Sequence, residues 1–187
     1  MWAAALAMGL AATPAASALP QADCSAHIAP ESSSATFVVS VRLPIRAEGR
    51  FNQIEGQLSL RPEGCEVAVR LDATAVVYTG PNWFADLSRS PAFLDVETHP
   101  EVHFVSQPFP ASRLIEGGAL LGTLRLRGHE RPVEFRLQPS GCDSPGQACP
   151  ILVRGSVNRR DFGMQAYRFT VKDAVHFEFS IRLEPAQ

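Results

Sequence analysis

The sequence predicts an all-β protein, an antiparallel barrel or sandwich with one short helical interruption. Apolar and polar residues alternate through at least eight runs of the chain, which is the period of half-buried strands. No long helical pattern and no glycine-rich phosphate loop occurs between these runs. The length of 187 residues suits one domain with a substantial core. Strands with one apolar face each are typical of antiparallel sheets.

The charge pattern gives no argument for a nucleic-acid partner or for an anionic membrane surface. The formal net charge is -2, and the 17 basic residues are spread along the chain without runs. All of them are arginine except Lys172. We therefore expect a solvated surface of mixed charge and no nucleic-acid binding.

The first 18 residues are apolar and small, and they end in the A-x-A pattern of a signal-peptide cleavage site. No Lys or Arg precedes this run, and with Pro14 it is too short to span a bilayer comfortably. The alternative is a short N-terminal helix. We expect a signal peptide at residues 1–18, an arm at residues 19–33, a periplasmic or secreted protein, and no stable membrane insertion.

Four cysteines fit an exported protein in an oxidising compartment, and they allow three disulfide connectivities. Cys142 and Cys149 flank the tight Pro-Gly turn of DSPGQA, so we expect these two to pair. This leaves Cys24 for Cys65. A zinc site is disfavoured because no C-x-x-C spacing occurs and the histidines are scattered.

Eight alternating runs are the predicted strands. They cover residues 37–43, 57–60, 66–72, 102–104, 120–127, 133–137, 153–157 and 175–183. The Arg-Pro-Glu-Gly turn at 61–64 separates the second run from the third, and Gly128 begins a short hairpin connection between the fifth and the sixth. The last run has the cleanest alternation in the chain.

The alternation stops between residues 79 and 104, where large apolar residues follow at spacings of three to four. These are Trp83, Phe84, Leu87, Phe93 and Leu94. Ser90 and Pro91 are typical of one short helix ending and another beginning, and Pro100 closes the segment. We expect an apolar, mostly helical lid at residues 81–95. The alternative is a loop that plugs one end of a barrel.

Three glycines, Gly56, Gly122 and Gly155, fall on the inward phase of predicted strands. Glycine inside a strand marks a sharp bend or the close approach of a ligand. Two readings follow: the glycines leave space along the barrel axis, or they only allow the sheet to close.

No residue pattern predicts catalysis. His99 and His103 are four residues apart, but on a strand this spacing separates them by roughly 13 Å, too far for one metal ion. His129 lies in a predicted turn and His176 on the outward phase of the last strand. No G-x-S-x-G motif is present. We expect no enzyme activity, no metal and no cofactor; a hydrolase or metal-dependent enzyme is the remote alternative.

Three segments together resemble the YceI-like family of exported lipid- or polyisoprenoid-binding proteins. They are Thr79-Gly80 with SRSPAFLDVETHPEVHF, then GTLRLRGHERPVEF, then VNRRDFGM before the last strand. The resemblance covers roughly residues 34–184. It implies an extended, lipocalin-like, eight-stranded antiparallel barrel at residues 34–185 with a short helical lid. It also implies an apolar tunnel for an isoprenoid or similar lipid, and no catalytic residues.

The chain departs from the family pattern at two places. Many members carry Arg-Asp shortly after the Thr-Gly pair, where this chain has Trp83 to Asp86. Many also carry a histidine near the end of the first long strand, where this chain has Arg42-Leu43-Pro44. The headgroup preference of the family is therefore not carried over.

The expected ligand contacts are inward strand residues, lid aromatics and residues of the VNRRDFGM loop. They are Phe37, Val39, Leu58, Val69, Trp83, Phe84, Phe93, Phe104, Leu124, Phe135, Arg159, Phe162, Phe177 and Phe179. For the Arg159-Arg160-Asp161 cluster two readings stay open: an ion pair that fixes the loop, or an arginine that meets a polar headgroup. The competing function is a filled barrel that binds another exported protein. Monomer and homodimer both remain open.

Overall fold

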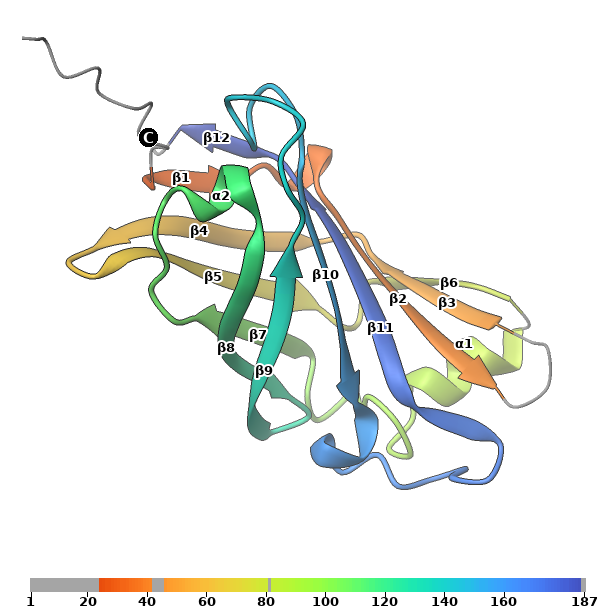
Figure 1. Ribbon diagram of the computed structural model, residues 1–187. Coiled ribbons are helices and arrows are strands. Elements are labelled where there is room, and N and C mark those ends of the chain that lie inside the picture. The colour runs from red at the N-terminus through yellow and green to blue at the C-terminus, as the bar shows by residue number, and fades with distance from the viewer. Residues whose placement is uncertain (1–23, 42–45, 81, 186–187) are drawn as a thin grey trace, which may run out of the picture.

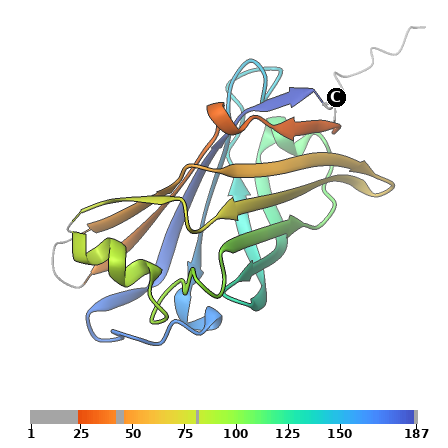
Figure 2. The same ribbon diagram turned by 180° about the vertical axis from the view of Figure 1, so that it is seen from behind.

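A computed structural model of the chain describes residues 24–41, 46–80 and 82–185, so the predicted signal peptide at residues 1–18 lies outside the described part. The described residues form one twelve-stranded antiparallel sheet that curls into a half-barrel (Figures 1 and 2). The all-β prediction is confirmed. In chain order the elements are β1 (Ala26–Ile28), η1 (Pro30–Ser32), β2 (Ser34–Val41), β3 (Arg46–Phe51), β4 (Ile54–Arg61), β5 (Gly64–Asp72), β6 (Val76–Thr79), α1 (Asn82–Arg89), β7 (Glu101–Ser106), α2 (Arg113–Glu116), β8 (Gly118–Leu126), β9 (His129–Leu137), β10 (Ile151–Asn158), η2 (Arg159–Phe162), β11 (Val171–Ile181) and β12 (Leu183–Pro185).

The strand count differs from the predicted eight, because four short strands were not expected: β1, β3, β6 and β12. Each of the eight predicted runs overlaps a different long strand, although residues 42–43 of the first run lie outside the described residues and the last run reaches into β12. The short strands continue β2, β4, β5 and β11 beyond an interruption. β3 shows why such a strand is hard to recognise. Its exposed residues are Arg46, Glu48 and Arg50, but two of its three inward residues, Ala47 and Gly49, are too small to give a clear apolar period.

At one end of the half-barrel the hydrogen-bonded strands form a complete ring around the barrel axis. At the other end the ring is incomplete. β12 follows β11 directly and pairs with β1, which also pairs with β4, while β2 pairs with β11. At the opposite end β6 pairs with β3, and among the described residues no pairing joins β6 to β7. The chain crosses this gap as α1 and residues 90–100 (Figure 2). The lid therefore covers the side where the sheet is open.

Both predicted disulfides are confirmed, and both lie at the end that carries β1 and β12. Cys24 pairs with Cys65, and Cys142 pairs with Cys149, with Cα–Cα separations of 5.5 and 6.2 Å that lie in the normal range. The amide of Leu183 donates to the carbonyl of Gly146 at 2.8 Å, which holds the Cys142–Cys149 loop against β12. We name this the disulfide end and the opposite one the lid end.

The lid contains one helix rather than two. α1 is helical as expected, but residues 91–98 form successive turns in place of a second helix. Asp95 has a positive φ of 53°, which a continuing right-handed helix does not allow. The amides of Leu94 and Val96 donate back to the carbonyls of Ser88 and Arg89, at 3.0 and 3.1 Å, and hold the turns against the end of α1.

The inward glycines do not leave empty space at their own positions. The ring of Phe104 lies over Gly122, and the ring of Phe135 lies over Gly155. A Cβ at Gly56 would meet the carbonyl of Ala68. The first reading of these glycines was therefore wrong: they admit neighbouring rings and close strand contacts, and the free volume lies elsewhere.

Candidate functional site

An apolar cavity of about 130 Å³ lies inside the half-barrel and is lined by thirty residues. A fully buried side chain touches about 6–12 others, so a compact void of this size would have far fewer neighbours. The space is therefore long and narrow. It extends from Phe109 and Leu183 at the disulfide end to Phe93 and Leu94 in the lid.

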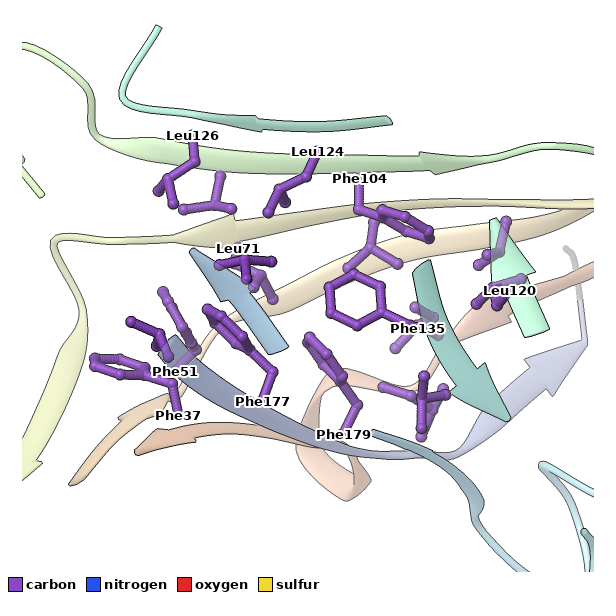
Figure 3. A pocket seen from close by; sticks show the side chains of 18 of the residues that line it. Phe37, Phe51, Leu71, Phe104, Leu120, Leu124, Leu126, Phe135, Phe177 and Phe179 are labelled. Carbon is purple, nitrogen blue, oxygen red and sulfur yellow. The ribbon is translucent and has the colours of Figure 1, made fainter. Parts of the chain in front are cut away.

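The cavity wall is apolar except at two positions, Ser88 and Arg159. Figure 3 shows aromatic and leucine side chains projecting toward a common interior from several strands. Rings follow one another along the interior: Phe37 lies 6.0 Å from Phe177, Phe177 stacks on Phe179 at 6.1 Å, and Phe179 meets Phe135 edge-on at 5.7 Å. Such a wall offers dispersion contacts along its length and hydrogen bonds almost nowhere.

Several inward apolar side chains are only half-buried because they face the cavity. Val67 and Val69 on β5 and Phe177 and Phe179 on β11 belong to this group. Ordinary protein interiors are packed with few voids larger than a water molecule. The half-barrel therefore has an unfilled core. An engineered apolar cavity of about 150 Å³ stays dry and binds benzene, so an apolar space of this order can accept an apolar ligand.

Eleven of the fourteen predicted contact residues line this cavity. They are Phe37, Val39, Leu58, Val69, Phe93, Phe104, Leu124, Phe135, Arg159, Phe177 and Phe179. The other three do not line it. Trp83 faces solvent with 53 % of its surface exposed, and Phe84 and Phe162 are buried in packing outside the cavity. Helical spacing marked Trp83 and Phe84 as apolar but did not show which face of α1 turns inward.

The wall also contains residues that the sequence analysis did not name as contacts. Val67, Leu71 and Val102 lie in predicted strands and were recognisable by their alternation. Phe109 and Leu114 lie between β7 and β8, where no periodic signal marks them. An isolated antiparallel β-bridge between the backbones of Cys65 and Phe109 holds this connection at the disulfide end, so only the tertiary structure brings it to the cavity.

Arg159 is 1 % exposed and acts as a junction for the loop between η2 and β11. Its guanidinium donates to the carbonyls of Met164 and Ala166, both at 2.7 Å, and to that of Lys172 at 3.2 Å. Its charge is paired with Asp173, 3.4 Å away, and burial lowers its pKa. An ion pair fixes the loop, as the first of the two readings proposed, but the partner is Asp173 rather than the adjacent Asp161.

The histidines do not converge. His103 lies on β7 and pairs with Glu101 at 2.9 Å, while His129 begins β9 and contacts the carbonyl of Arg127. In the described ranges no three His, Cys, Asp or Glu residues are grouped as a metal site. None of the described helices has the length and apolarity needed to cross a membrane.

Comparison with protein families identifies a YceI-like domain over residues 27–183. A comparison with curated protein sequences finds no significant match.

Solved structures with the same fold include two at high coverage. BcnA of Burkholderia cenocepacia is 17 % identical with a TM-score of 0.67, and the match covers 84 % of this chain and 99 % of BcnA. A polyisoprenoid-binding domain from Saccharophagus degradans is 16 % identical with a TM-score of 0.65, covering 88 % of this chain and all of that domain. A YceI protein of Campylobacter jejuni is 15 % identical with a TM-score of 0.55, covering 74 % of this chain and 84 % of that one.

Proposed function

This chain belongs to the YceI-like domain family, and from that premise we propose that it binds one long apolar ligand along the axis of its half-barrel. The ligand class is an isoprenoid chain or a similar lipid. The observation that carries the proposal is the long, narrow and almost entirely apolar cavity. The family is associated with binding rather than catalysis, and a similar fold belongs to a polyisoprenoid-binding domain, which supports the same class.

Burial alone supplies the affinity in such a site. Each CH₂ group withdrawn from water contributes about 0.8 kcal/mol, so a chain of about a dozen carbons offsets the ordering costs of binding. The narrow cavity favours a thin, flexible chain over a bulky fused-ring ligand. A chain of this length would displace some half-buried side chains such as Phe177 and Phe179, which already have room to move.

The protein is proposed to act in the periplasm or outside the cell as a carrier, store or sensor of its ligand. Two disulfides support an oxidising compartment. The competing function, a filled barrel that only binds another protein, requires a packed interior. The half-buried inward residues disfavour it.

The direct test is native mass spectrometry of protein purified from an exporting host, followed by solvent extraction. We expect an additional mass that organic solvent removes, and a rise in melting temperature when prenyl or acyl chains are added to the extracted protein. A ligand-free mass together with no uptake of any prenyl or acyl chain would contradict the proposal.

A pair of variants locates the site. Val69→Phe combined with Val153→Phe adds two rings to the cavity wall, and we expect ligand uptake to fall at least tenfold while the fold is kept. The matched control is Val105→Phe, because Val105 lies on β7 and is 45 % exposed. It should bind as the wild type does. Equal uptake by both variants would place the ligand outside the cavity.

A further inference from the structure

The exposed Phe, Tyr and Trp side chains of the described residues all lie at the lid end. Phe169 is 70 % exposed, and Trp83 and Tyr167 are more than half exposed. Every other Phe or Tyr side chain in the described ranges is buried or half-buried. Trp83 lies on α1, whereas Tyr167 and Phe169 lie in the loop between η2 and β11, and both segments lie at the same end in Figures 1 and 2. We name these three residues the lid-end aromatic patch.

This patch adjoins the cavity wall. The ring of Tyr167 stacks on that of Phe93 with 6.0 Å between the centroids, and Phe93 lines the cavity. The loop that carries Tyr167 also contributes Met164 to the cavity wall. On α1, Ser88 lines the cavity while Trp83 faces solvent. Each of the two segments therefore reaches from the cavity to the surface.

Hydrogen bonds of the backbone hold the loop in a tight turn. The carbonyl of Tyr167 accepts from the amides of Thr170 and Val171, at 3.0 and 2.8 Å, and Arg159 donates to the carbonyl of Ala166 at 2.7 Å. The turn leaves the ring of Phe169 in solvent. Several large apolar side chains gathered at one end of a protein indicate an interaction surface.

The same loop is cationic. Between residues 165 and 172 it carries Arg168 and Lys172, both exposed, and no acidic residue. The Arg168 guanidinium lies over the Phe169 ring, 4.6 Å from its centroid. Aromatic rings and long cationic side chains suit the interface between water and lipid headgroups. They are also common in protein interfaces, so composition alone does not identify the partner.

The proposed ligand distinguishes the two partners. Each CH₂ group favours an apolar phase over water by about fourfold, so a chain of about a dozen carbons favours a bilayer by about 10⁷-fold. Such a ligand is held in membranes and is almost absent from water. A protein whose cavity end touches the bilayer exchanges the ligand without a step through water, so a lipid surface is the partner that this end requires.

We propose that the lid-end aromatic patch docks on the surface of a phospholipid bilayer, and that the ligand passes between bilayer and cavity at this end. The docking is peripheral and reversible: the exposed rings enter the headgroup region, and Arg168 and Lys172 meet lipid phosphates. This inference rests on the proposed function and adds its partner, a lipid surface.

The test measures the transfer of cis-parinaric acid, a thin fluorescent acyl chain, from the loaded protein to vesicles. The vesicles contain phosphatidylcholine, phosphatidylglycerol and a lipid-linked fluorescence quencher. We expect the transfer rate to rise in proportion to the vesicle concentration, because each transfer needs a contact. Transfer through water would have the same rate at every vesicle concentration, because release from the protein would limit it. Flotation with the same vesicles measures docking directly.

Phe169→Ser removes the most exposed ring of the patch and changes no residue of the cavity wall. We expect the vesicle-bound fraction and the transfer rate to fall about fivefold, because interfacial binding scales with buried apolar area. The affinity for cis-parinaric acid in solution should stay within twofold of the wild type. Phe169→Trp should keep docking and transfer at the wild-type level or above.

The matched control is Leu60→Ser. Leu60 is 71 % exposed, as Phe169 is, but it lies at the disulfide end, opposite Cys65 in the β4–β5 pairing. It should dock and transfer as the wild type does, and thermal melting checks that each variant folds.

Two results overturn the docking surface while the apolar-chain proposal stands: a transfer rate that does not depend on vesicle concentration, or equal values for Phe169→Ser and Leu60→Ser. The patch would then be a site for a partner protein. A protein that takes up neither cis-parinaric acid nor any prenyl chain overturns the proposed function and the ligand passage together.

Discussion

At the disulfide end of the half-barrel the chain is tied by two covalent cross-links, whereas the described lid end is held by hydrogen bonds and ring contacts. Cys24–Cys65 joins the start of β5 to the segment before β1, and Cys142–Cys149 closes the loop that contacts β12. At the lid end Arg159 donates hydrogen bonds to backbone carbonyls of the loop after η2, and the ring of Phe93 stacks on that of Tyr167 at 6.0 Å. The disulfide end is fixed by covalent cross-links. The lid end is fixed by non-covalent contacts, which can open and re-form.

The two ends also differ in what they present to the cavity. The disulfide end contributes only apolar side chains such as Phe109, Leu114 and Leu183, whereas both polar lining residues, Ser88 and Arg159, lie at the lid end. The difference suggests a division of roles. We expect the disulfide end to hold the far end of an apolar chain, and the lid end to admit the ligand and receive its head.

The largest expected effect tests the covalent end. Replacing Cys24 and Cys65 together with alanine opens a loop of 41 residues and should lower the free energy of unfolding by about 4 kcal/mol in the chain-entropy description. Replacing Cys142 and Cys149, which are 7 residues apart, should cost about 2.5 kcal/mol. Urea unfolding of the purified variants measures both values. Equal costs, or none, would mean that the cross-links do not secure this end.

The next effect tests the non-covalent end. Arg159→Met leaves the carbonyls of Met164 and Ala166 without their donor and Asp173 without its buried partner, so unfolding should become easier by about 3 kcal/mol. Arg160→Met is the matched control, because Arg160 is largely exposed and its ion pair with Asp173 is worth at most about 1 kcal/mol. If the two arginine variants unfold alike in urea, Arg159 is not the junction of the lid end.

A smaller effect depends on pH. The pKa of Tyr78 is raised by burial to about 12, which means that the folded state holds the neutral phenol more favourably than the charged phenolate. Its stability contribution is fully present below the ordinary pKa of about 10 and is lost as pH rises through 12. Discounted for the partial exposure of the ring, the free energy of unfolding should fall by about 1–2 kcal/mol between pH 9.5 and 12. Tyr78→Phe should remove most of this slope, and Tyr167→Phe should keep it.

The smallest effect concerns the exposed surface of the lid. Trp83→Ala removes a side chain that is 53 % exposed and outside the cavity wall, so its stability should change by less than about 0.5 kcal/mol. Uptake of an apolar chain should also stay within twofold of the wild type. Phe93→Ala, which shortens a lining residue of the same segment, should alter uptake more. A large loss of binding in Trp83→Ala alone would place the ligand on the outside of α1.

The sequence by itself determined eight of the twelve strands and which of their residues turn inward. Alternation with a period of two is a local property, so residues 175–181 identify most of β11 and its apolar face without any knowledge of the neighbouring strands. The disulfide pairs followed from cysteine spacing and turn residues, and the helix of the lid followed from the break in alternation. β3 was not predicted because two of its three inward residues, Ala47 and Gly49, carry almost no apolar signal.

Only the tertiary structure decided whether the inward side chains fill the core or surround a space. That outcome depends on how strongly the sheet curls and on which distant strands face one another, and the same Val, Leu and Phe serve either purpose. The rings over Gly122 and Gly155, the Arg159–Asp173 pair and the buried Tyr78 hydroxyl beside Ser88 all join residues from separate strands, helices and loops. No local sequence pattern predicts such contacts, because they arise from the way the whole sheet curls.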